Sequence, residues 1–199
     1  KRIMPLWGTS DSDESKPKNL TTAEKKEVYA TNSGWVREAG SILSGNGNTD
    51  ADPEVLVAVS GLADSIGAAD VTEVEWITTT ADKSEGFTLS VRVRYNEEVT
   101  VTGSPTLAVT NGNQGSGSGR GPHTLVYASG TGTNELVFSL AIAAANAATN
   151  ANDVLSIGAQ NIAKPSGATI KDTADGTTNA AVAISGAQGT AAGTLTVTA

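Results

Sequence analysis

One segment in the middle of the chain alternates strictly between apolar and polar side chains. Between residues 87 and 95 every second residue is apolar, namely Phe87, Leu89, Val91, Val93 and Tyr95. The residues between them are polar, namely Thr88, Ser90, Arg92 and Arg94. Because successive side chains of a strand point to opposite faces, this period of two predicts a half-buried antiparallel strand.

Further short apolar runs, separated by turns rich in Gly, Asn and Asp, follow from residue 71 onward. They predict strands at residues 74–79, 98–101, 106–110, 124–128, 136–142, 154–157, 181–185 and 195–197. Residues 141–151 are rich in Ala, but their Asn and Thr content and their position between strands favour a crossing loop. Many short strands punctuated by turn residues are typical of a β-sandwich, which we place at residues 71–199.

The first 27 residues predict an extended N-terminal arm, because they are highly polar and show no apolar periodicity. The arm contains a single apolar patch, formed by Met4, Pro5, Leu6 and Trp7. A large aromatic side chain is a favourable anchor at an interface, so these four residues are candidate partner-binding residues. A disordered terminus is the alternative. Thr21 followed by Glu24 fits a capping box and predicts the start of a short helix.

Residues 28–70 predict a small β region of their own. Two apolar runs, at residues 34–36 and 54–59, flank a turn-rich stretch at residues 44–50. This pattern indicates a small hairpin or two strands of a minor sheet. A unit of this size without cysteine or a metal is marginal alone, so we expect it to pack on its neighbour or on a partner. Trp35, in the first run, is therefore a further candidate partner-binding residue.

The composition limits the classes of function. At 199 residues the chain has room for one ordinary domain and a smaller one. The net charge of −8 argues against a nucleic-acid partner, because phosphate binding needs clustered Lys and Arg. There is no cysteine, which excludes disulfides and thiolate metal sites. No apolar run approaches the ~20 residues that span a bilayer, so we expect no membrane partner either.

The sequence contains few residues suited to catalysis. His123 is the only histidine, so any Ser-His-Asp arrangement would depend on it, and we interpret it as a polar residue at a loop edge. Glu97 with Glu98, or Glu73 with Glu75, would serve a glycosidase only at a defined separation across a cleft. We expect Glu73 and Glu75 to form a solvated strand edge instead. The prediction is a protein without catalytic residues that is not an enzyme.

Calcium is the metal that the sequence leaves open, because hard cations take oxygen ligands from loops. Residues 50–54 and 172–176 are acidic stretches. The first contains Pro53 and lacks a Gly at the sharp turn, and the second lacks the distal Glu of an EF-hand. A hairpin turn explains Asp175-Gly176 without any metal. We therefore predict no metal site and no cofactor, with calcium as the alternative.

Three stretches of the sandwich region occur in a recognisable order and spacing. They are residues 92–107, which include Glu98-Val99-Thr100-Val101-Thr102-Gly103-Ser104-Pro105-Thr106-Leu107, residues 125–138, and Ile170-Lys171-Asp172-Thr173-Ala174-Asp175-Gly176. Together they resemble a family of bacterial and phage immunoglobulin-like surface modules, which are usually adhesive or architectural. The resemblance implies an all-β fold, an immunoglobulin-like antiparallel sandwich preceded here by the extended arm and the small β-hairpin region. An adhesive or carbohydrate-binding module is one functional alternative.

The N-terminal residues carry a second resemblance. Met4-Pro5-Leu6-Trp7-Gly8-Thr9-Ser10-Asp11, Gly34-Trp35-Val36 and Glu54-Val55-Leu56-Val57-Ala58 are similar to the opening of small virion structural proteins of T4-like marine tailed phages. The resemblance implies a capsid decoration or head-stabilising subunit on the particle surface, anchored through its arm. Its partners would be the major capsid protein or other virion proteins, and it would form a homo-oligomer or symmetric array. A neck, collar or tail component is the nearest alternative.

Overall fold

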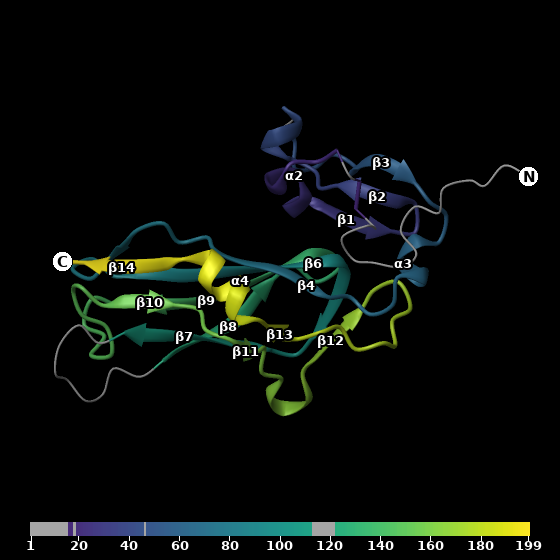
Figure 1. Cartoon of the computed structure of the whole chain (residues 1–199). Helices are drawn as coiled ribbons and strands as arrows, with labels where there is room; N and C mark the ends of the chain where they lie inside the picture. Colours follow the sequence, from purple (N-terminus) through teal and green to yellow (C-terminus); the bar gives the residue numbers. More distant parts are fainter. Residues whose placement is uncertain (1–15, 18, 46, 113–121) are drawn as a thin grey trace, which may run out of the picture.

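The computed structural model describes the chain except residues 1–15, 18, 46 and 113–121. Strands dominate the described residues and form one large mixed sheet and a small two-stranded sheet, so the predicted all-β, sandwich-like fold is confirmed. A small N-terminal sheet lies over one end of an elongated sandwich, and the C-terminal residues lie at the opposite tip (Figure 1). No helix within the described ranges is long and apolar enough to cross a membrane.

The alternating segment forms the first half of the longest strand, β6 (Phe87–Thr102). Residues 98–101, predicted as a separate strand, continue β6 beyond a register shift between Arg94 and Val99. β6 pairs antiparallel with β9 (Thr133–Ile142), β4 (Val71–Trp76) and β12 (Thr169–Asp172). The apolar residues of the alternation turn inward, as the period of two requires. The most deeply buried are Leu89, Val91, Val93 and Tyr95.

The remaining strands complete the sandwich around one core. They are β7 (Thr106–Gly112), β8 (His123–Ser129), β10 (Val154–Ser156), β14 (Thr194–Thr198) and the short β5 (Ala81–Asp82). The chain of pairings runs β6-β9-β8-β7-β10-β14-β5. A single hydrophobic cluster joins side chains of β6 and β9 to those of the other strands, including Leu107, Leu125, Phe138, Leu155 and Val197. Burying this shared apolar face is what holds the two layers together.

Several elements differ from the sequence prediction. The crossing loop after β9 is confirmed, because residues 143–153 form turns. Within the predicted strand at residues 181–185, only β13 (Ala183–Ile184) is a strand in the structure. It pairs with β11 (Gln160–Asn161), which was not predicted. A short 3-10 helix, η2 (Pro165–Gly167), precedes β12. Helix α4 (Gly186–Ala192) was also not predicted, although Ser185 and Gln188 form a capping box at its start.

The N-terminal unit is a three-stranded sheet with short helices. Its elements are α2 (Thr22–Lys26), β1 (Val28–Thr31), β2 (Gly34–Arg37), η1 (Ile42–Ser44), β3 (Glu54–Ala58) and α3 (Leu62–Ser65). The capping box predicted at Thr21 and Glu24 is confirmed. The predicted pairing of β2 with β3 is also confirmed, and β1 adds a third strand that was not predicted. The predicted arm lies largely outside the described residues.

The small sheet is joined to the sandwich by main chain as well as by side chains. β1 pairs in parallel with β6 at Ala30 and Glu97, so the two units share one continuous sheet. The small sheet keeps a hydrophobic cluster of its own, formed by Val28, Ala30, Trp35 and Leu62. This arrangement matches the expectation that a unit of this size packs on its neighbour.

Candidate functional site

Arg94 lies at the centre of the junction between the small sheet and the sandwich. Its side chain, on the polar face of β6, is only 6% exposed. The guanidinium forms ion pairs with Glu38 at 2.7 Å, Glu75 at 3.1 Å and Glu135 at 2.5 Å. It also donates a hydrogen bond to the carbonyl oxygen of Lys26 at 3.2 Å. These partners come from the small sheet, from β4 and from β9, so one side chain ties three segments together.

The electrostatics of this junction reflect its burial. Burial opposes the charge of Arg94, but the carboxylates of Glu135 and Glu38 outweigh that effect and raise its pKa. Burial and the neighbouring charge of Glu135 raise the pKa of Glu38, although Arg94 acts in the opposite direction. Charges taken out of water are stable only when they are paired in this way. The network therefore fixes the orientation of the small sheet on the sandwich.

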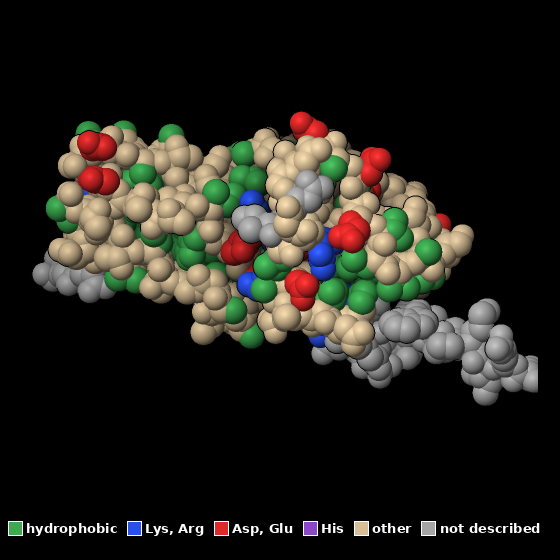
Figure 2. Space-filling view, turned by 90° about the horizontal axis from the view of Figure 1, so that it is seen from above, with side chains coloured by type: hydrophobic (Ala, Val, Ile, Leu, Met, Phe, Trp, Pro, Cys, Tyr) green, Lys and Arg blue, Asp and Glu red, His purple; other side chains and the backbone are tan. Residues whose placement is uncertain are grey.

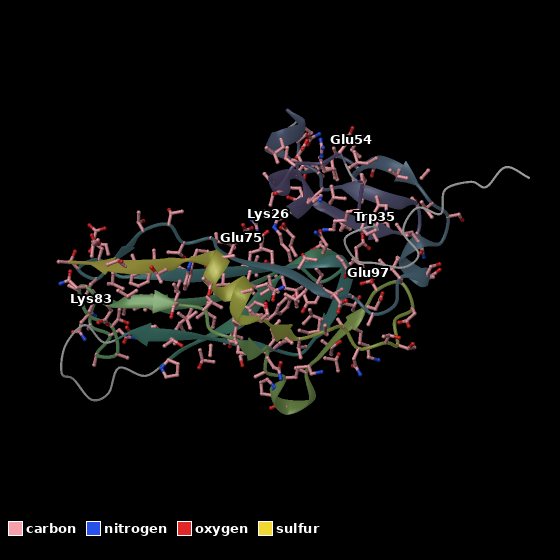
Figure 3. All side chains as sticks on the ribbon, viewed as in Figure 1. Lys26, Trp35, Glu54, Glu75, Lys83 and Glu97 are labelled. Carbon is pink, nitrogen blue, oxygen red and sulfur yellow. The ribbon has the colours of Figure 1, made fainter. Side chains whose placement is uncertain are left out.

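Glu73 and Glu75 do not form the solvated strand edge that we predicted. Lys26, at the end of α2 in the N-terminal unit, forms an ion pair with Glu73. Glu75 accepts hydrogen bonds from Arg92 Nη1 and from Arg94 Nε, each at 3.1 Å. Figure 3 places Lys26 and Glu75 at the junction of the two units. The prediction is wrong because the small sheet covers the polar face of the strands that carry these carboxylates.

A groove of about 620 Å³ lies where the small unit meets β4 and α4. Its lining includes Lys16, Lys25, Lys26, Trp35, Glu73 and Gln188. Gln188 is held in place by a hydrogen bond that it donates to the carbonyl oxygen of Val71 at 2.8 Å. The groove thus combines several cations with an indole.

The predicted partner-binding residues fall into two groups. Met4, Pro5, Leu6 and Trp7 lie outside the described residues. Trp35 is 1% exposed and packs inside the cluster of the small sheet, so its ring stabilises that unit. Its Nε1 is buried without a hydrogen-bond partner in the described part of the chain, and the residue also lines the groove. Any contact of Trp35 with a partner would therefore be made through the groove.

An exposed apolar edge of the small sheet was not predicted as a site. β3 is the last strand of the sheet and, among the described residues, pairs only with β2. Val55 on this strand is 50% exposed, and Leu43 in the preceding η1 is 47% exposed. An edge strand presents unpaired N–H and C=O groups that can pair with another chain. After Glu54, residues 55–59 are all apolar, so no alternation indicates which face or edge stays open.

His123 is the first residue of β8, and its side chain is buried, which the sequence did not indicate. Its Nε2 lies 3.1 Å from the Oγ1 of Thr149, and Thr149 is fully buried. Burial lowers the pKa of His123, while the charge of Asp153 acts in the opposite direction. Asp153 Oδ2 accepts hydrogen bonds from Asn111 Nδ2 at 2.9 Å and from the backbone N–H of Asn150 at 2.8 Å. This network anchors the crossing loop on the sandwich. Its hydroxyl group, that of Thr149, is buried from solvent.

A small acidic cavity lies on another side of the junction. It has a volume of about 240 Å³ and contains Glu97, Glu98 and Asp172 in its lining. Glu97 is 1% exposed, and neither of its carboxylate oxygens has a hydrogen-bond partner in the described ranges. Burial raises the pKa of Glu97 to about 8, and Asp172 contributes to the shift through its charge. Glu97 is thus a deeply buried carboxylate of the junction for which the described residues provide neither a cation nor a hydrogen-bond donor.

The two acidic stretches considered for calcium differ in structure. The predicted Asp175-Gly176 turn is confirmed, because Gly176 has a φ of 65° and Asp175 Oδ1 accepts the N–H groups of Thr177 and Thr178, each at 2.8 Å. The hydroxyl of Thr178, which also donates to Asp175, and these two N–H groups together lower the pKa of Asp175 to about 2. In the other stretch, Glu54 forms an ion pair with Arg37. Nowhere in the described sequence do three or more Asp, Glu or His side chains converge on a metal position.

Comparison with protein-family models, with curated proteins and with solved structures finds no match to this chain. The fold and the surfaces described above therefore define its class. It is an all-β protein in which a small sheet with an open apolar edge is fixed on a sandwich by buried ion pairs.

Proposed function

We propose that the chain is a non-enzymatic structural subunit of a tailed-phage particle, attached through its N-terminal unit with the sandwich facing water. A capsid decoration or head-stabilising role is the specific form of this proposal. The observation that carries it is the open edge of β3 with the exposed side chains of Val55 and Leu43. Adding a strand to such an edge gives affinity through main-chain hydrogen bonds and specificity through side chains.

The distribution of charge supports a division between an attachment end and a solvated body. Figure 2 shows charged side chains gathered over the junction, while uncharged side chains dominate the sandwich beyond it on this face. The ion pairs of Arg94 hold the attachment end and the body in one orientation. A subunit of a symmetric array needs such a fixed geometry, because every copy must meet its partners in the same way.

The aromatic residues favour this role over a sugar-binding module. In the described part of the chain, every Trp, Tyr and Phe side chain is buried or half-buried. Tyr127, for example, packs edge-to-face on Phe138 with ring centroids 6.2 Å apart. Binding sites that stack sugars need exposed aromatic rings on one face, since the ring is the contact surface.

The proposal is tested by locating the protein in particles and by changing the edge of β3. Mass spectrometry and cryo-electron microscopy of particles from cells that express the chain should find it at repeated positions on the head. Val55→Asp should abolish co-sedimentation with particles that lack the protein. Val126→Asp is the matched control, because Val126 is 41% exposed but lies on β8 of the sandwich. Particles without the protein, or equal binding by the two variants, would refute the proposal.

A further inference from the structure

The acidic cavity lies at the contact of four segments from the two units. The small unit contributes residues 30–32 at the end of β1 and Ala63 of α3. The sandwich contributes residues 97–98 of β6 and residues 172–174 at the end of β12. Figure 3 shows Glu97 where β6 passes under the small sheet. Asn32 is exposed and forms part of the rim, so the cavity communicates with solvent. A ligand bound there would contact both units.

The lining of this cavity carries negative charge only. Glu97, Glu98 and Asp172 line it, and neither Lys, Arg nor His is present among the lining residues. Asp64 on α3 and Asp70 before β4 add further negative charge that acts on Glu97. Like charges in a partly desolvated space repel one another strongly, because the effective dielectric constant there is far below that of water. The cavity thus favours a cation.

Glu97 provides the independent sign that a ligand belongs here. It is 1% exposed, and both oxygens are buried without a hydrogen-bond partner in the described residues. Leaving a buried carboxylate unpaired costs several kcal/mol in general, so such groups in folded proteins are paired, protonated or bound to a metal. Asp172 is 2% exposed and uses its Oδ1 to accept the N–H of Ala174 at 2.7 Å. This bond orients the second carboxylate of the cavity.

We propose that this cavity binds a calcium ion, with Glu97 and Asp172 as its anionic ligands. Calcium takes six to eight oxygen ligands in flexible geometry, including carboxylates, amide and main-chain carbonyls, and water. Two carboxylates agree with the finding that no three acidic side chains converge among the described residues. Asn32, main-chain carbonyl groups and water complete the shell. The 240 Å³ volume is large beside the ~30 Å³ of one liquid water molecule, which leaves room for water ligands.

The ion would link the N-terminal unit to the sandwich, because both would provide its ligands. Its ligands come from β6 and β12 on one side and from the β1–β2 turn on the other. With only two carboxylates we expect a dissociation constant on the order of 10⁻⁴–10⁻³ M, the range of weak extracellular calcium sites. At 10 mM calcium such a site raises the melting temperature by roughly 3–10 °C.

The test is calorimetric titration of the full chain with calcium chloride, together with thermal unfolding in calcium or in a chelator. The wild-type protein should bind one ion and melt higher in calcium than in sodium chloride of equal ionic strength. Glu97→Gln and Asp172→Asn keep the shapes of the side chains and should weaken binding at least roughly tenfold. Glu85→Gln, an exposed carboxylate remote from the cavity, is the matched control and should respond like the wild-type protein.

Two results would overturn the assignment. One is a wild-type protein that neither releases heat nor changes its melting temperature at 10 mM calcium. The other is a calcium response that Glu97→Gln retains in full, since the ion would then bind elsewhere. If either variant fails to fold, the titration of the wild-type chain still decides whether the ion binds.

Discussion

Removing the guanidinium of Arg94 should weaken the junction between the two units more than any other single change of charge there. Arg94→Ala would leave Glu38 without an ion-pair partner among the described residues, and Glu75 and Glu135 with Arg92 alone. The side chains of these carboxylates are 20%, 31% and 23% exposed, so water can relieve only part of their repulsion. The change therefore removes three ion pairs and creates a repulsive cluster in one step.

The expected loss follows from the burial of the arginine. Breaking a buried ion pair by removing one partner costs about 3–5 kcal/mol. We expect the low end, about 3 kcal/mol, because the carboxylates keep some contact with water. For a chain of this length, 1 kcal/mol shifts the melting temperature by about 2–4 °C, so the shift should be roughly 6–12 °C. Arg92→Ala is the control: its side chain is 32% exposed, and exposed pairs contribute at most about 1 kcal/mol.

Urea denaturation followed by circular dichroism, at several pH values, measures this effect. Acid should reduce the deficit of Arg94→Ala, because protonation of the carboxylates removes their repulsion. The pKa of Glu38 is already raised in the wild-type protein and should rise further without the arginine. Equal losses for Arg92→Ala and Arg94→Ala, or a deficit that does not change with pH, would refute the view that Arg94 organises the junction.

Two further predictions concern the small sheet and the acidic cavity. A Cβ added at Gly34 would lie 2.0 Å from the carbonyl oxygen of Val57, and the φ of Gly34 is +129°. Gly34→Ala should therefore lower the free energy of unfolding by more than about 1 kcal/mol. Gly47→Ala is the control and should not lower it, because a Cβ at Gly47 would lie in open space. Because the pKa of Glu97 is raised from 4.5 to about 8, the folded state binds more protons than the unfolded state between these two pH values. Without calcium, the free energy of unfolding should therefore fall as the pH rises from about 4.5 to about 8. Glu97→Gln should make the free energy of unfolding less dependent on pH in this range. Identical melting curves for the two glycine variants would contradict the first prediction. A pH dependence of stability that Glu97→Gln leaves unchanged would contradict the second.

The sequence predicted the sandwich where the apolar pattern is regular and long. The alternation of residues 87–95 determines the strand, its inward face and its place in the core, and all three are observed. β12 was missed because only Ile170 among its four residues is a fully buried apolar side chain. β1 was missed because it follows the polar arm without a turn signal. α4 was missed although Ser185 and Gln188 form a capping box, because Gly186 and Gly189 give the segment a low helix propensity.

The site could not be predicted because it depends on contacts between units. Alternation correctly places Arg94 on the polar face of β6, but a period of two cannot indicate that another sheet covers this face. The same limit explains why Glu73 and Glu75 were expected to be solvated. Trp35 was predicted as a partner-binding residue, and the structure shows that its ring is part of the core of the small sheet.

The two acidic clusters of the junction differ in a way that bears on function. Glu38, Glu75 and Glu135 surround an arginine, so their charge is compensated within the chain. Glu97 is more deeply buried than any of them, yet the described chain provides it with no cation. A fold that neutralises one cluster internally and leaves a buried carboxylate of the other without a partner makes the second half of the junction dependent on an ion or a proton. The stability of the contact between the sandwich and the N-terminal unit would then depend on the calcium concentration and on the pH around the protein.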